Sequence, residues 1–287
     1  MEKLGRRVAT SVVFVVLFLL ALFHPWLAPH LAFLMVGGAI TLGLWELYDL
    51  VERRGVRVWR ICGVTTGWLL ALAGYVRILG YEGLSLEFVA ILFLFFSTFS
   101  VQLRRGISGA VPTVMGTFFG VVYVAAPMTA ILWIYNLSGG RWLLLFLFLV
   151  TCLNDTGAYL IGSKFGRLPL SPRISPRKTI EGSLGGLFCG VAGAFLLGWL
   201  MQWGSPVNYF YWAPADKTVY GQAFILAVLL SVVGQIGDLS ESMLKRDAGV
   251  KDSGSSLTGH GGMLDMADSL LFTVPFTFLY AKTVLNL

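Results

Sequence analysis

The sequence has few charged residues for its length. Only 13% of its 287 residues are Asp, Glu, Lys or Arg, whereas 56% are hydrophobic. A soluble domain carries roughly 25% charged residues, so this chain lacks the charge that a water-facing surface requires. The composition excludes a disordered chain, a coiled coil and a nucleic-acid-binding domain, and it indicates a protein embedded in a membrane.

Cysteine and histidine are also scarce, with three residues of each type. Cys62, Cys152 and Cys189 lie in apolar stretches, which indicates buried thiols and no disulfide or metal pattern. The sequence has no glycine-rich phosphate loop ending in Gly-Lys-Ser/Thr and no zinc-ligand spacing. It also lacks a Ser/His/Asp arrangement, so we do not expect hydrolysis through a covalent serine.

Long apolar runs predict about nine transmembrane helices, because a helix needs about 20 apolar residues to cross the hydrocarbon core. We therefore expect an all-α fold, a polytopic helical bundle integral to the membrane. The predicted spans are roughly residues 8–23, 27–45, 61–80, 86–102, 110–135, 141–161, 183–203, 221–237 and 264–285.

Basic residues predict the orientation of these spans. Every second loop is rich in Lys and Arg, as in Arg53, Arg54, Arg57 and Arg60 between the second and third spans. Such loops lie on the cytoplasmic side, so the N-terminus is predicted to be cytoplasmic and the C-terminus outside. This orientation fits a bacterial inner membrane or an organelle membrane.

Residues able to carry chemistry lie mainly in the second half. We divide the chain into residues 1–140, with about five spans, and 141–287, with about four spans and two cytoplasmic loops, 162–182 and 238–264. Asp155 lies inside the sixth predicted span, where a carboxylate costs on the order of 3 kcal/mol, so it indicates a functional site. The alternative is an acid close enough to the interface to reach water.

The loop from Gly162 to Gly182 contains three prolines and several basic residues, which exclude a long regular helix. Ser175 and Lys178 precede the start of the seventh span. Basic side chains and free backbone N–H groups at a helix start bind anions, so we expect phosphate to bind here. An ordinary basic cytoplasmic loop is the alternative.

The segment from Asp238 to Asp268 is the most informative. If the eighth span continues as a helix, Asp238, Glu241 and Lys245 share one face. The ninth predicted span opens with Asp265 and Asp268, whose spacing also predicts one helix face. Oxygen ligands such as these, together with substrate phosphates, indicate Mg²⁺. The alternative for the last two acids is a favourable interaction with the positive end of a helix.

These residues resemble the signature of the phosphatidate cytidylyltransferase family, also called CDP-diacylglycerol synthase. The resemblance covers roughly residues 140–285 and rests on three blocks of residues. The blocks are Ser242-Met243-Leu244-Lys245-Arg246 with Lys251-Asp252, His260-Gly261-Gly262, Asp265 and Asp268; Asp155-Thr156-Gly157-Ala158-Tyr159 with Gly162, Gly166, Ile174-Ser175-Pro176, Lys178-Thr179 and Glu181-Gly182; and Gly237-Asp238 with Glu241-Ser242.

The resemblance implies an Mg²⁺-dependent nucleotidyltransferase of phospholipid biosynthesis that converts CTP and phosphatidic acid into CDP-diacylglycerol and pyrophosphate. It also implies a homodimer in contact with membrane lipids, and an active site that faces the cytoplasm. The predicted roles are as follows: Asp238, Asp265 and Asp268 hold Mg²⁺, alone or with a second cation; Ser175, Lys178, Arg246 and Lys251 bind substrate; Asp155, Asp238, Lys245, Asp252 and His260 are catalytic.

Two positions depart from the family pattern. Met266 and Ala267 stand where the family usually has arginine followed by an apolar residue, and Thr258 stands where it favours proline. The alternative for His260, a lone histidine in a loop, is a structural role.

Three other functions compete with cytidylyl transfer: those of a CTP-dependent polyprenol or dolichol kinase-like enzyme, an ion-coupled transporter, and an inactive lipid-binding relative. The completeness of the motif spacing favours cytidylyl transfer.

Overall fold

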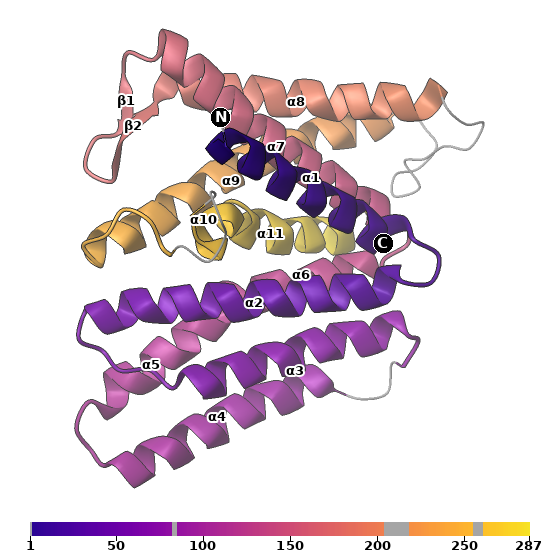
Figure 1. Cartoon of the computed structure of the whole chain (residues 1–287). Helices are drawn as coiled ribbons and strands as arrows, with labels where there is room; N and C mark the ends of the chain where they lie inside the picture. The colour runs from indigo at the N-terminus through magenta and orange to yellow at the C-terminus, as the bar shows by residue number, and fades with distance from the viewer. Residues whose placement is uncertain (1, 82–84, 204–217, 255–260) are drawn as a thin grey trace. The chain divides into compact units, whose positions relative to one another are not determined.

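A computed structural model describes residues 2–81, 85–203, 218–254 and 261–287. Nearly all of the regular structure in these residues is helical (Figure 1). The elements are α1 (Glu2–Phe23), α2 (Ala28–Arg53), α3 (Arg60–Ile78), α4 (Leu86–Arg105), α5 (Ala110–Gly120), the π-helical turn η1 (Val121–Ala125), α6 (Ala126–Tyr135), α7 (Gly140–Phe165), β1 (Pro169–Ser171), β2 (Ser175–Thr179), α8 (Ile180–Trp203), α9 (Thr218–Asp247), α10 (Met263–Ala267) and α11 (Leu270–Thr283).

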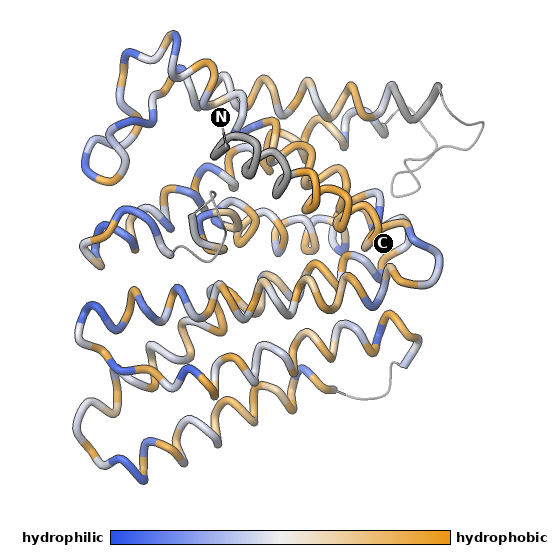
Figure 2. The backbone as a smooth tube through the Cα atoms, in the orientation of Figure 1, coloured by the Kyte–Doolittle hydropathy of each residue, from blue (hydrophilic) through white to orange (hydrophobic). Residues whose placement is uncertain are grey.

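Seven helical segments among the described residues are long and apolar enough to cross a membrane, which confirms an all-α membrane protein. They correspond to the second to eighth predicted spans, and α5, η1 and α6 together form one of them, Ala110–Tyr135. Figure 2 shows hydrophobic residues along α2 and α4, and hydrophilic residues where α2 leads to α3. Among the side chains that the structure describes, α1 contributes the apolar stretch Val12–Phe23, and α11 has 14 residues. A count of nine spans and the orientation of the termini therefore stay predictions.

The ninth predicted span is not one continuous helix. α10 ends at Ala267, and Asp268 lies in the turn before α11, so the prediction that Asp265 and Asp268 share a helix face was wrong. The Asp268 carboxylate accepts the backbone N–H of Ser269 at 2.5 Å. An aspartate that binds its neighbouring backbone in this way competes with the helical hydrogen bonds, which explains the break.

The described chain forms two compact units. Unit 1 is Met1–Trp133 with Leu244–Ala267, and unit 2 is Ile134–Met243 with Asp268–Leu287. The division at residue 140 that we made from the sequence separates regions by their chemistry. The compact units divide the chain differently, because Leu244–Ala267 belongs to unit 1.

Tyr48 of α2 lies at the centre of unit 1, where α2, α3 and α5 pack together. It is fully buried, and its hydroxyl donates a hydrogen bond to the carbonyl of Thr117 at 3.0 Å. A Cβ atom at Gly63 or Gly120 would overlap the tyrosine ring. In a bilayer, close packing of this kind is what holds helices together, because lipid tails are as apolar as the side chains.

In unit 2, α7 and α8 lie side by side through small residues (Figure 1). A Cβ atom at Gly157 would meet Cys189, and one at Gly185 would meet Ile161. The antiparallel hairpin β1–β2 connects the two helices, with Pro169 paired to Thr179 and Ser171 paired to Ser175. This confirms that the loop 162–182 is not a long helix, and it places β2 beside the start of α8.

Candidate active site

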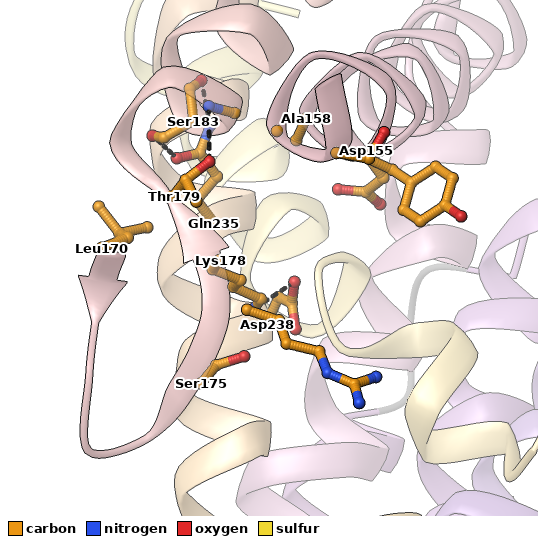
Figure 3. Close-up of a pocket in the computed structure, with 14 residues that line it drawn as sticks. Asp155, Ala158, Leu170, Ser175, Lys178, Thr179, Ser183, Gln235 and Asp238 are labelled. Atoms are coloured by element: carbon orange, nitrogen blue, oxygen red, sulfur yellow. Dashed lines mark hydrogen bonds and ion pairs between the residues drawn. The ribbon is translucent and has the colours of Figure 1, made fainter. Parts of the chain in front are cut away.

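Unit 2 contains a cavity of about 550 Å³ built by α7, the hairpin, α8 and α9 (Figure 3). Four of the predicted site residues line it, so the fold brings together residues that are up to 83 positions apart (238 − 155). The lining residues are Asp155, Ala158, Tyr159, Gly162, Ser163, Leu170, Ser175, Arg177, Lys178, Thr179, Gly182, Ser183, Gln235 and Asp238.

An ion pair between β2 and α9 crosses this cavity. The Lys178 ammonium contacts the Asp238 carboxylate, and the two side chains are 27% and 31% exposed (Figure 3). Ser175 and Lys178 lie on the same short strand, which presents them at the cavity. A partly exposed ammonium at the wall of a cavity can move to the phosphate group of a ligand.

Three carboxylates of unit 2 lie close enough to affect one another's charge. Asp155 interacts electrostatically with Asp238, and Asp268 interacts with both of them. Among the described side chains, the Lys178 ammonium pairs with Asp238 and also interacts electrostatically with Asp155. The excess of negative charge suits a divalent cation.

Among the described residues, no group of three or more His, Cys, Asp or Glu side chains has the geometry of a complete metal site. Magnesium is often held by one or two carboxylates and completes its shell with water and substrate phosphates. Asp238 and Asp268, which come within hydrogen-bonding distance of each other, fit that incomplete type of site.

A polar network supports this cavity, and we did not predict it from the sequence. Gln235 of α9 donates hydrogen bonds to Asn154 Oδ1 at 3.2 Å and to the Ser183 carbonyl at 3.1 Å. The Ser183 hydroxyl donates back to Gln235, and Asn154 donates to Asp155 at 3.3 Å. The network links α7, α8 and α9 directly behind Asp155. A glutamine in the middle of an apolar span was the signal that could have revealed it.

The start of α8 differs from the anion site that we predicted. The N–H of Ile180 donates to the Leu168 carbonyl at 2.9 Å, and the N–H of Gly182 donates to Thr179 Oγ1 at 3.1 Å. Glu181 accepts the N–H groups of Arg167 and Leu168. The expectation of free N–H groups at these positions was therefore wrong, because the hairpin itself uses them. Side chains of the cavity remain available to bind phosphate.

The remaining described site residues lie in unit 1. Lys245 donates to Asp265 Oδ1 at 2.6 Å, and these side chains are 11% and 15% exposed. Asp265 also accepts the N–H groups of Ser253 at 3.1 Å and Gly262 at 2.9 Å. Asp265 thus connects the last turn of α9 to two separate points of the segment that follows it.

These contacts determine the charge state of Asp265. Burial acts to raise its pKa, but the Lys245 ammonium and the N–H groups of Gly262 and Ser253 outweigh burial and hold the pKa below its ordinary value. The carboxylate is therefore ionised at neutral pH, and its charge is already paired with the Lys245 ammonium and hydrogen-bonded to the backbone.

The other predicted residues are more open. Lys251 and Asp252 are exposed, and Arg246 donates to the carbonyl of Val250 at 3.0 Å. Met266 is 37% exposed. His260 and Thr258 lie outside the residues that the structure describes.

Comparison with known proteins identifies relatives of this chain. Residues 5–284 match the Cytidylyltransferase family. Phosphatidate cytidylyltransferase of Staphylococcus aureus (strain COL) is 44% identical over 140 residues, which are 48% of this chain and 48% of the relative. The protein of that name from Synechocystis sp. (strain ATCC 27184 / PCC 6803 / Kazusa) is 44% identical over 135 residues, 46% of this chain and 40% of the relative.

A third relative is the protein of Escherichia coli (strain K12) that is called Uncharacterized protein YnbB. It is 36% identical over 180 residues, which are 61% of this chain and 56% of the relative. The chain therefore spans about half the length of the curated relatives it matches.

Proposed function

Because this chain belongs to the Cytidylyltransferase family, we propose that it transfers the cytidylyl group of CTP to phosphatidic acid, which yields CDP-diacylglycerol and pyrophosphate. The observation that carries the proposal is the cavity of unit 2, where Lys178, Asp155 and Asp238 line space for a polar headgroup. The relatives named phosphatidate cytidylyltransferase support the choice of lipid substrate.

In the proposed reaction, a phosphate oxygen of phosphatidic acid attacks the α-phosphorus of CTP. A new phosphorus–oxygen bond forms, and the bond between the α-phosphorus and the bridging oxygen breaks, so that pyrophosphate leaves with the bonding electrons. Phosphatidate is an anion near pH 7, so the protein need not supply a nucleophile. Positioning and charge neutralisation then account for most of the rate.

The residues of the cavity suit this task. Lys178 leaves Asp238 and binds a substrate phosphate, while Ser175 donates a hydrogen bond to the same group. Asn154 and Gln235 hold Asp155 at the cavity wall. The family resemblance supports a phosphate-binding role for Lys245, Arg246, Lys251 and Asp252 of unit 1, and an orienting role for His260.

We propose Mg²⁺ as the cofactor, held by Asp238 and Asp268 of unit 2. Bound there, it would neutralise charge on the phosphates. Asp265 was also predicted as a metal ligand, and its contacts with Lys245 and two backbone N–H groups favour a positioning role instead.

The basic loops support a cytoplasmic active site in a bacterial inner membrane. CTP would enter from the water, and phosphatidic acid would enter sideways from the bilayer. The homodimer stays a prediction from the family resemblance.

The test uses purified protein in detergent with phosphatidic acid, Mg²⁺ and CTP labelled at either the α- or the γ-phosphate. Cytidylyl transfer moves only the α-label into lipid, and EDTA stops it. A lipid kinase moves only the γ-label, so that result would replace the proposal.

A matched pair of variants locates the reaction. Lys178→Met removes the ammonium of the cavity and is expected to lower kcat/KM on the order of 100-fold. Lys164→Met changes an exposed lysine near the end of α7 that does not line the cavity and is expected to keep wild-type activity. Equal activity in the two variants would argue against this cavity as the site.

A further inference from the structure

Glu46 is an acid inside a membrane-spanning helix, far in sequence from the signature residues. Glu46 lies in α2, a span of unit 1, and is only 5% exposed. A buried carboxylate in such a segment is costly unless its charge is used. The contacts of Glu46 show how its charge is used.

The Glu46 carboxylate accepts hydrogen bonds from two stretches of residues 245–267, which we call the signature segment. Ser253 donates its hydroxyl to Oε2 at 3.0 Å. The N–H groups of Met263 and Leu264, at the start of α10, donate to Oε1 at 2.9 Å and to Oε2 at 2.8 Å. One side chain of α2 thus holds both Ser253 and the first residues of α10.

Two glycines make this approach possible. A Cβ atom at Gly254 would lie 2.8 Å from Glu46 Oε1, and a Cβ atom at Gly262 would overlap Glu46 Oε2 and Ser253 Oγ. Any side chain at Gly262 would therefore push the backbone away from the carboxylate. Gly262 belongs to the signature, so at least one of its glycines is explained by room for Glu46.

The signature segment also carries Lys245 and Asp265, to which we assign roles in the reaction. Ser253 gives its hydroxyl to Glu46 and its N–H to Asp265, and Asp265 in turn binds Lys245. Glu46 and Asp265 are therefore two carboxylates that meet at one serine. Loss of either acid removes one of the two carboxylates that hold Ser253.

We propose that Glu46 is a positioning residue for cytidylyl transfer, which fixes the segment that carries Lys245, Lys251 and Asp265. This inference rests on the proposed function. The inference gives the hydrophobic first half of the chain a role in activity, because α2 supplies the residue that orders the signature segment.

The experiment compares Glu46→Gln with Glu52→Gln. The second variant is a matched control, because Glu52 lies on the same helix and pairs with Arg60 at 2.6 Å, away from the signature segment. Glutamine keeps the shape of Glu46 but turns an NH₂ group toward N–H donors. Ser253→Ala, which removes the hydroxyl that donates to Glu46 Oε2, is a milder variant in case Glu46→Gln does not fold.

Two measurements are made on each variant. Hydrogen–deuterium exchange of the peptide covering 261–267 is expected to rise at least fivefold in Glu46→Gln and to stay unchanged in Glu52→Gln. KM for CTP or for phosphatidic acid is expected to rise at least fivefold in Glu46→Gln. Partial unfolding would instead lower the maximal rate and leave both KM values unchanged.

The outcomes separate the two proposals. Unchanged exchange at 261–267 in both Glu46→Gln and Ser253→Ala would overturn the anchor itself. Faster exchange with wild-type KM values would overturn its link to catalysis. If the wild-type protein moves no α-label into lipid, the proposed function fails and the link to catalysis with it, while the exchange measurement still decides whether Glu46 orders the segment.

Discussion

Replacing Asp265 by asparagine tests whether this acid stabilises the fold of unit 1. The wild-type carboxylate accepts from the Lys245 ammonium and from the N–H groups of Ser253 and Gly262. Asparagine has one acceptor oxygen and presents an NH₂ group to the remaining donors. It also removes the negative charge beside Lys245.

The expected loss of stability follows from these contacts. A hydrogen bond to a charged group contributes about 1.5–3 kcal/mol. Because Lys245 and Asp265 are only 11% and 15% exposed, water replaces little of their interaction. We expect Asp265→Asn to lower the free energy of unfolding by about 3 kcal/mol, which corresponds to roughly 6–12 °C in the unfolding midpoint.

The effect should depend on pH in one direction. The pKa of Asp265 is lower in the folded protein than its ordinary value of about 4, so the folded state favours the ionised form. The stabilisation is then complete above roughly pH 5 and declines as the pH falls through 4 toward the folded pKa. The difference between wild type and Asp265→Asn should therefore be constant from about pH 6 to 8 and shrink below about pH 4.

The assay is thermal unfolding of purified protein in detergent, with Asp247→Asn as the control. Asp247 forms an exposed ion pair with Arg54, the two side chains being 62% and 59% exposed, and exposed pairs contribute about 0–1 kcal/mol. If Asp265→Asn unfolds at the same temperature as Asp247→Asn at pH 7, Asp265 does not stabilise the segment. A loss that stays undiminished at pH 3.5 would show that the ionised carboxylate is not its source.

Two further variants test the packing of unit 2. Gln235→Leu removes three hydrogen bonds between helices, each worth about 0.6 kcal/mol in a membrane protein. Unfolding in denaturant should therefore show a loss of about 2 kcal/mol in the free energy of unfolding. A stability equal to wild type would contradict the network. Gly185→Val places a side chain against Ile161 and should cost about 1–3 kcal/mol in the same assay. The control for the second is Gly221→Ala, where a Cβ atom meets nothing within 4 Å and no loss is expected.

The helical membrane fold was predictable from the sequence because apolar length is a local property. Runs such as 86–102 and 110–135 reappear as α4 and as the span Ala110–Tyr135. The break between α10 and α11 was not predictable in the same way. It depends on the hydrogen bond between Asp268 and Ser269, which spacing alone does not reveal.

The candidate site shows the same division. Asp155, Ser175, Lys178 and Asp238 were selected from the sequence because charged and polar residues beside apolar spans are unusual, and the fold brings these four to one cavity. Gln235 was missed because an uncharged amide costs less free energy to bury in a span than a carboxylate does, and so indicates a functional site less strongly.

Composition and short-range spacing were enough to predict that the protein is helical, lies in a membrane and carries the cytidylyltransferase motif, because all three are local properties of the chain. The partners of the charged side chains depend on the tertiary structure. Lys178 pairs with Asp238, Lys245 pairs with Asp265, and Glu46 holds a segment more than 200 positions away. The physical reason is that a buried charge is stabilised by whichever groups the fold brings within hydrogen-bonding distance, and those groups lie far apart along the chain.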